Sequence, residues 1–167
     1  MPSLAVVATT GRTGQLVVER GLAAGYDVTA IARLPGNLAL DHPRRTADAL
    51  NPESLRGALA RPEAVVSALG STGLGPTTVC SAGTAAIVSA LPSGARLMVL
   101  SSAALATPPD AGPGARLLGG ILRWVLRHPY ADMARMEKLL ASSGLAWTAV
   151  PPSGLTDQPA PRFPRLR

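Results

Sequence analysis

Five consecutive residues near the start of the sequence have the types and spacing needed to hold a pyrophosphate. They are Thr10, Gly11, Arg12, Thr13 and Gly14, and they separate an apolar run from a stretch with helical periodicity. Glycine lets the backbone turn tightly and approach a phosphate, and the N–H groups at a helix N-terminus favour its negative charge. The pattern predicts a dinucleotide phosphate site, although glycine-rich turns of this kind also occur for packing alone.

A second candidate is Arg33, nineteen residues beyond Gly14 and directly after the apolar run 28–32. At the carboxyl end of the second strand of a dinucleotide fold, an acidic residue accepts hydrogen bonds from the ribose of NAD, whereas arginine pairs with the 2′-phosphate of NADP. The sequence therefore favours NADP(H), and Arg12 is a second candidate for that phosphate. The alternative is a solvated surface arginine, in a chain that has fifteen arginines.

Apolar runs alternate with helical stretches along the chain, and this alternation predicts the elements that position these residues. Between residues 35 and 48 a third strand is expected, but only Thr46 and Ala47 hint at one. The pattern predicts an α/β fold, a Rossmann-type doubly wound parallel sheet in three α/β/α layers. We expect the chain to form one domain, residues 1–157, followed by an irregular tail at 158–167. We expect strands at 4–8, 28–32, 64–69, 97–100 and 146–150, and helices at 13–24, 51–59, 79–91, 117–126 and 130–142, with a loop at 106–114.

Composition narrows the class of protein. The 167 residues fit one domain, and 47% hydrophobic with 16% charged residues is typical of a folded globule. The net charge of +6 comes from scattered cations with few aromatic residues, so we expect no nucleic-acid partner. Cys80 is the only cysteine and no Cys/His cluster has metal-ligand spacing, so we expect no metal. Without a leader or a membrane-spanning run, we expect a soluble, cytoplasmic protein and no membrane partner.

Six motifs occur in order along the chain and carry a resemblance to a known family. As a set, they make the chain resemble the atypical short-chain dehydrogenase/reductase family with NAD(P)-binding, NmrA-like members, close to the flavin reductase/biliverdin reductase B group. The resemblance extends through residues 154–159. The six motifs are residues 8–14, 30–33, 48–50, 67–70, 101–103 and 130–133.

The resemblance implies a role for each matching residue. It places the turn of residues 10–14 at the pyrophosphate and Arg33 at the 2′-phosphate. Two catalytic candidates follow: Ser102, which either bonds the nicotinamide amide or substrate or simply ends a strand, and Tyr130, which either faces the pocket or packs against the surface. The remaining cofactor contacts would be Asp48 and Ala49 at the adenine, Ala68, Leu69 and Gly70 at the ribose, and Ser101 and Pro151 at the nicotinamide.

The function implied by the resemblance is an NADPH-dependent reductase that transfers a hydride to a flavin-like or other conjugated small molecule. Two departures keep alternatives open: Ala8 replaces the family's first glycine, and Ala134 lies where a Tyr-x-x-x-Lys pair would place lysine after Tyr130. The alternatives are an NADP(H)-binding redox-sensing regulator without turnover and a degenerate, non-catalytic paralogue. The family usually continues past this chain's end, so we also expect an apolar face that a homodimer would cover.

Overall fold

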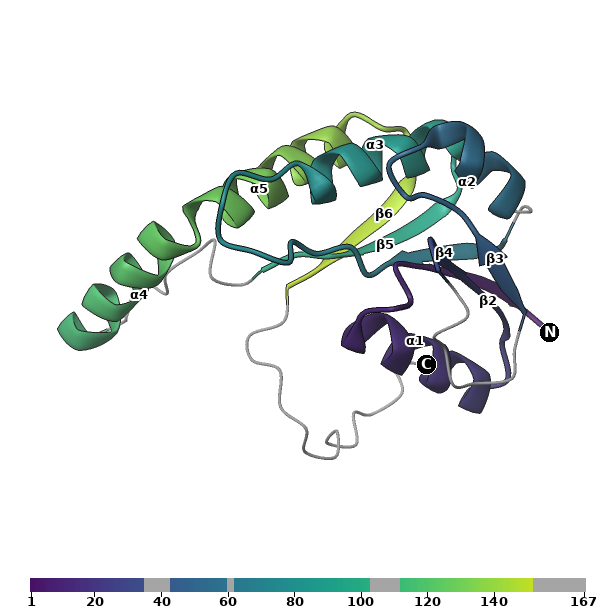
Figure 1. Ribbon diagram of the computed structural model, residues 1–167, viewed down its shortest axis with the longest axis horizontal. Helices are drawn as coiled ribbons and strands as arrows, with labels where there is room; N and C mark the ends of the chain where they lie inside the picture. Colours follow the sequence, from purple (N-terminus) through teal and green to yellow (C-terminus); the bar gives the residue numbers. More distant parts are fainter. Residues whose placement is uncertain (35–42, 60–61, 103–111, 152–167) are drawn as a thin grey trace.

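The strands form a single parallel sheet in the order β3-β2-β1-β4-β5-β6 (Figure 1). The computed structural model describes residues 1–34, 43–59, 62–102 and 112–151. This strand order confirms the predicted Rossmann-type fold. The elements are β1 (Ser3–Val7), α1 (Arg12–Ala23), β2 (Asp27–Ala32), β3 (Arg44–Thr46), α2 (Pro52–Ala58), β4 (Ala64–Ser67), α3 (Val79–Ala90), β5 (Arg96–Leu100), α4 (Pro113–Val125), α5 (Arg127–Ala141) and β6 (Ala146–Val150).

Helices cover the two faces of the sheet, as Figure 1 shows: α1 lies on one side, and α2, α3 and α5 lie on the other. The central strand β1 is buried on both faces. Leu4 and Val6 pack with Val18 of α1, whereas Ala5 and Val7 belong to the larger core formed with α2, α3 and α5. Alternate residues of a strand point to opposite faces, so a continuous apolar run is what a strand between two helical layers requires.

Local signals in the sequence set several helix ends. The Asn51 side chain accepts hydrogen bonds from the backbone N–H groups of Glu53 and Ser54 at 3.0 and 3.3 Å, so it caps α2. Gly25 follows α1 with a φ of +82°, and its N–H donates to the carbonyl of Leu22. Glycine stops α1 here because it adopts this left-handed conformation without steric cost.

Two boundary predictions are corrected by the structure. Pro113 begins α4, so residues 113 and 114 are helical where a loop was expected; proline is favoured at a first helical position, where no N–H donor is needed. The same rule explains why α4 and α5 separate at Leu126 while Pro129 lies inside the first turn of α5. Residues 106–111 of the predicted loop, the predicted domain end at 157 and the 158–167 tail lie outside the described residues.

The third strand is short. β3 has three residues, all exposed, and pairs with the carboxyl half of β2, so Ala32 lies beside Thr46. An exposed edge strand of charged residues carries almost no apolar pattern, which is why the sequence only hinted at it. Its position still matters, because the residues that follow it approach the end of β2.

Candidate functional site

A crevice opens at the carboxyl ends of β1 and β4. Here the strand order changes direction, because β2 and β3 lie on one side of β1 whereas β4, β5 and β6 lie on the other. From β1 the chain continues to α1 on one face, and from β4 it continues to α3 on the other (Figure 1). Open α/β sheets bind their ligands at such a switch point. The crevice holds a cavity of about 290 Å³, close to the lower end of the usual size for small-ligand sites.

Most of the predicted cofactor residues meet in this cavity. The eight predicted residues that line it come from four separate segments of the chain. Val7, Ile31, Leu50, Thr72 and Val79, which the sequence did not single out, complete part of the wall. The eight predicted residues are Thr10, Gly11, Arg33, Asp48, Ala49, Ala68, Leu69 and Gly70.

A larger groove of about 770 Å³ runs beside α1, from the predicted residue Thr13 in its first turn to Ala24 at its end. Leu16, Val66 and Met98 line it, together with Arg20 and Arg96. Volume alone favours this groove, but it lacks the residues that follow β2, β3 and β4, and much of its lining, including Ser3, Ala64 and Arg96, lies at the amino ends of the strands. We therefore assign the functional site to the smaller cavity.

The turn between β1 and α1 is tightly built. Ala8 has a φ of +66°, in the left-handed region that glycine adopts freely and that costs other residues about 1–2 kcal/mol. Its N–H donates to the carbonyl of Ile31 at 3.0 Å, and its own carbonyl accepts from the N–H of Gly11 at 3.3 Å. The glycine-to-alanine change noted in the sequence therefore falls where the backbone has a conformation suited to glycine.

The two glycines of this turn have different tasks. A Cβ on Gly14 would lie 2.5 Å from the carbonyl oxygen of Ala8 and 2.8 Å from the Cα of Thr9, so Gly14 allows α1 to pack directly against the turn. A Cβ on Gly11 would have no protein atom closer than 3.7 Å. Gly11 lines the cavity and precedes α1, which has no side-chain cap and no acidic residue in its first turn. This helix N-terminus suits an anion.

Arg33 and the loop after β3 form another part of the cavity lining. Arg33 is exposed directly after β2, and Asp48 lies in the same wall. The loop is held by local hydrogen bonds: an Asp48 carboxylate oxygen accepts from the N–H of Leu50 at 3.0 Å, and the N–H of Asp48 donates to the hydroxyl of Ser54 at 3.1 Å. A cation thus stands at this wall beside an ordered loop.

The other predicted residues do not line this cavity. Ser101 is buried, its N–H donates to the carbonyl of Val150 at 3.0 Å, and its hydroxyl donates to the carboxylate of Glu137 on α5. Ser102 is half-buried, and Pro151 is exposed after β6. The two strands end together, since Leu100 pairs with Val150. The remaining four residues are Arg12, Thr13 and Gly14, at the start of α1, and the half-buried Tyr130 in the first turn of α5.

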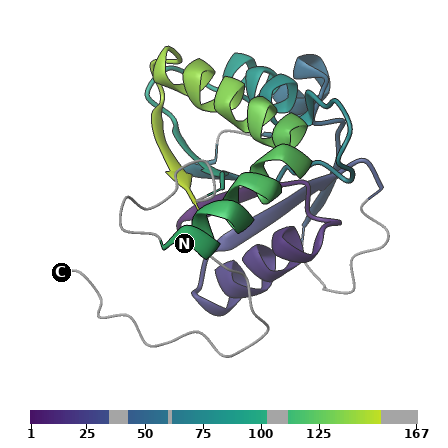
Figure 2. The same cartoon turned by 90° about the vertical axis from the view of Figure 1, so that its left-hand side faces the viewer.

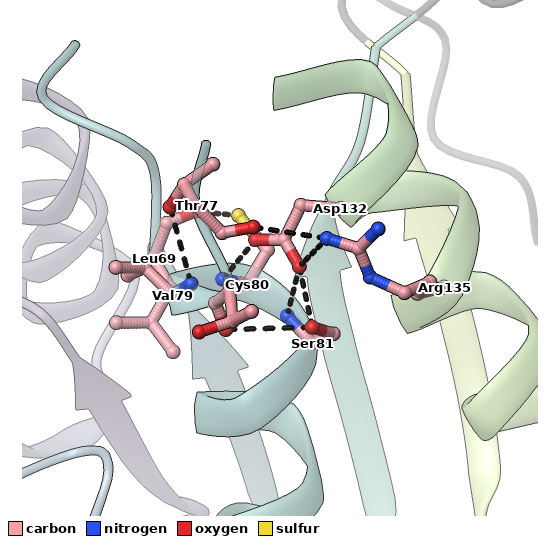
Figure 3. A network of polar contacts seen from close by, with 8 residues as sticks. Leu69, Thr77, Val79, Cys80, Ser81, Asp132 and Arg135 are labelled. Carbon is pink, nitrogen blue, oxygen red and sulfur yellow. Dashed lines mark hydrogen bonds and ion pairs between the residues drawn. The ribbon is translucent and has the colours of Figure 1, made fainter. Parts of the chain in front are cut away.

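A buried carboxylate that the sequence did not single out organises the region behind the cavity (Figure 3). Asp132 of α5 is 0% exposed and accepts hydrogen bonds from the N–H groups of Cys80 and Ser81 at 2.8 and 3.2 Å, and from the Ser81 hydroxyl. Its other partner is Arg135, at 3.3 Å, which also donates to the carbonyl of Thr77. A side chain of α5 therefore caps α3.

This network reaches the cavity wall through Cys80, whose thiol lies 3.8 Å from the carbonyl oxygen of Leu69. Burial, and then the negative charge of Asp132, raise the pKa of Cys80 to about 11, so the thiol stays neutral. One signal in the sequence was available. Asp132 stands four residues before Met136 on the face that also buries Leu140, and a carboxylate at a buried helical position needs donors.

Two general properties complete the description. Among the residues that the structure describes, no three histidine, cysteine or acidic side chains gather as a metal site. Within the same residues, no helix combines the length and apolar character needed to cross a membrane.

A family model described as NAD(P)H-binding matches residues 9–166. The chain belongs to this NAD(P)H-binding family. NAD(P)H is therefore its cofactor, and the resemblance stated from the sequence is confirmed at this level. The residues present fit the group: Gly11 leaves the wall beside the N-terminus of α1 free of a side chain, and Arg33 lines the same cavity.

Solved structures of other proteins share the fold. The NAD(P)H-binding chain is similar to the oxidoreductase ylbE from Lactococcus lactis, with 21% identity and a TM-score of 0.75 over 95% of this chain and 72% of that one. It is also similar to SP1627 of Streptococcus pneumoniae TIGR4, described as a candidate NADH-flavin reductase, with 22% identity and a TM-score of 0.66 over 89% and 70%. A Rossmann-fold NAD(P)-binding family protein from Shigella flexneri gives 19% identity and a TM-score of 0.64 over 95% and 70%.

Proposed function

We propose that this protein is an NADPH-dependent reductase of a flavin-like or other flat, conjugated small molecule. One observation carries the proposal: Gly11, at the N-terminus of α1, and Arg33, after β2, line the same cavity at the switch point. A helix N-terminus and a guanidinium are the two groups that recognise the phosphates of NADP(H). The likeness to a candidate NADH-flavin reductase supports the substrate class.

The binding roles divide along the cavity. The turn of residues 10–14 would hold the pyrophosphate, with Arg33 at the 2′-phosphate and Arg12 as its second cation. Selectivity for NADPH over NADH then rests on Arg33, because NADH lacks the phosphate that a guanidinium would neutralise. On the same assignment, the Asp48–Ala49 wall faces the adenine, and residues 68–70 face the ribose.

The nicotinamide side is expected at the carboxyl ends of β5 and β6. When bound, the cofactor supplies a hydride, and the chain's own task is to orient two flat rings and exclude water. Ser102 would bond the nicotinamide amide or substrate, and Pro151 would pack beside it. The carboxylate of Glu137 accepts a hydrogen bond from the hydroxyl of Ser101, and this bond holds the end of β5 against α5.

A second function is favoured by one observation. Ala134 stands four residues beyond Tyr130, and Lys138 is exposed two helical turns away, so the sequence lacks the tyrosine–lysine pair of a general acid. A redox-sensing regulator that binds NADP(H) without turnover needs no such acid. A reductase of a conjugated ring also depends little on a general acid, because the ring delocalises the negative charge that hydride transfer adds.

Thermal shift with NADPH, NADP⁺ and NADH tests the binding assignment. Selective binding raises the melting temperature by mass action, so NADPH must shift it more than NADH does. Arg33→Ala is expected to weaken NADPH binding at least about tenfold and to leave NADH binding nearly unchanged. Arg96→Ala removes an exposed arginine at the amino ends of the strands and serves as the matched control. An equal loss for both cofactors in Arg33→Ala would refute its role.

Following the absorbance of reduced cofactor in the presence of flavins and quinones then tests turnover. Steady decay that requires the second substrate supports the reductase. A protein that binds NADPH selectively but leaves it unoxidised across the panel is a sensor, and one that binds none of the three cofactors is a degenerate paralogue.

A further inference from the structure

Helix α4 stands apart from the rest of the molecule. In Figure 1 it projects beyond the sheet and the other helices, and Figure 2 brings it to the front. Its main contact among the described elements is the start of α5. Three large apolar side chains are open on it: Ile121 is 54% exposed, Leu122 is 45% exposed and Trp124 is 69% exposed. Single exposed apolar residues are ordinary, but three on one turn form a patch.

The charges of this region all have one sign. From residue 111 to residue 131 the sequence contains no acidic residue, and it carries arginines at 116, 123 and 127. Within α4, at 100° per residue, Arg123 falls on the side of the helix axis opposite Ile121, and Arg127 follows at the start of α5. Trp124 borders the two: the Arg127 guanidinium lies 5.1 Å from the centre of its ring. The apolar side chains of α4 thus lie beside a cationic edge formed by Arg123 and, at the start of α5, Arg127.

We propose that α4 docks on an anionic lipid surface. An amphipathic helix with arginines on one face and Trp, Leu and Ile on the other lies in the plane of a membrane interface, with its apolar face at the acyl boundary. α4 has 13 residues, too few to span a bilayer, so it would lie on the surface. This departs from the sequence-based expectation of no membrane partner, which rested on the lack of a spanning segment.

Charge decides between a lipid surface and a second copy of the chain. The other open apolar surface is the groove beside α1, and Arg20 and Arg96 line it with one acidic residue, Glu63. A helix that carries only cations is repelled by such a rim in a molecule of net charge +6. An anionic headgroup layer attracts the same helix, and each arginine near the surface adds to the attraction.

Vesicle co-sedimentation of the full chain tests the proposal. We expect binding to phosphatidylcholine–phosphatidylglycerol vesicles at least about tenfold tighter than to phosphatidylcholine vesicles, because two arginines face the headgroups. The double variant Arg123→Gln/Arg127→Gln should lose that preference, and Leu122→Asn/Trp124→Ser should lose binding to both. The matched control is Arg20→Gln/Arg96→Gln, which removes the same charge from another surface and should still bind.

Trp124 supplies a second readout. The sequence has two tryptophans, so Trp147→Phe leaves Trp124 as the only reporter. Its emission should shift to shorter wavelength when anionic vesicles are added and stay unchanged without them. Absence of vesicle binding, or equal binding by the two arginine double variants, would overturn the proposal. A shift that appears without vesicles as protein concentration rises, with a dimer in sedimentation, would show that a second copy covers α4 and would equally overturn it.

Discussion

The carboxylate of Asp132 on α5 accepts a hydrogen bond from the backbone N–H of Cys80 at 2.8 Å, in the first turn of α3. The two residues are 52 positions apart in the chain. The same carboxylate accepts a hydrogen bond from the N–H of Ser81 and forms an ion pair with Arg135. It therefore joins two helices of one layer and holds the segment that leads from the cavity wall into α3.

Replacing Asp132 by alanine should therefore lower the free energy of unfolding by about 2–4 kcal/mol, since two N–H groups at the start of α3 lose their acceptor. Urea denaturation measures the loss. Asp132→Asn keeps one acceptor oxygen and should lose clearly less. Glu19→Ala, at an exposed position of α1, is the control and should stay within about 0.5 kcal/mol of the parent. Equal stabilities for Asp132→Ala and Glu19→Ala would contradict the capping role.

The thiol of Cys80 gives a prediction at high pH. Its pKa is raised from an ordinary value of 9.0 to about 11, so the folded state keeps the proton over a range where the unfolded chain loses it. Stability from this group is complete below pH 9 and is lost as the pH rises toward 11, by about 2 kcal/mol in all. Denaturation at a series of pH values should show this decline, and Cys80→Ala should lack that part of it. A parallel decline in both proteins would show that the thiol is not responsible.

Replacing Ala8 by glycine should stabilise the protein, whereas an alanine-to-glycine change usually lowers the free energy of unfolding. Ala8→Gly should raise the free energy of unfolding by about 0.5–1 kcal/mol, because glycine adopts a φ of +66° without the cost that alanine has there. Ala82→Gly makes the same change at an exposed position inside α3 and should lower stability by about 1 kcal/mol. Thermal or urea denaturation of both variants checks the pair. A loss of stability in both would mean that the turn relaxes around Ala8 at no cost.

The sequence predicted the sheet and much of the lining of the cavity at the switch point, because both depend on local patterns. Buried parallel strands are continuous apolar runs, and the residues that follow them must meet at one edge of the sheet, so Gly11, Arg33 and Leu69 come together from separate segments. Periodicity could not show that α4 stands free, since an amphipathic helix has the same pattern whether its apolar face is covered or open.

Long-range polar contacts were also beyond a reading of the chain. The bond from Ser101 to Glu137 and the capping of α3 by Asp132 each join residues 36 or more positions apart. No local rule pairs such residues: their meeting depends on how α5 packs against β5 and α3. Met133 and Met136 recur at helical spacing and pack in the core, but this spacing does not indicate which polar partners that face of α5 meets.

The two glycines of the first turn separate packing from binding. Gly14→Ala places a methyl group 2.5 Å from the carbonyl oxygen of Ala8, which is backbone and cannot rotate away, so α1 must move from the turn. We expect a loss of stability of about 1–3 kcal/mol together with weaker NADPH binding. Gly11→Ala has no protein atom within 3.7 Å of the new methyl group, at a φ of −78° that alanine adopts readily. Its melting temperature should stay close to that of the parent.

NADPH affinity is then the decisive measurement on Gly11→Ala. The new methyl group borders the cavity at the N-terminus of α1, where the pyrophosphate is proposed to rest. Calorimetric titration should show NADPH and NADH weakened alike, by about tenfold or more, because both share the pyrophosphate. Gly57→Ala, at an exposed position of α2 with open space around the new Cβ, is the control and should bind as the parent does. If Gly11→Ala keeps the parent's affinity for both cofactors, the pyrophosphate lies elsewhere and the turn is glycine-rich only for the packing of α1.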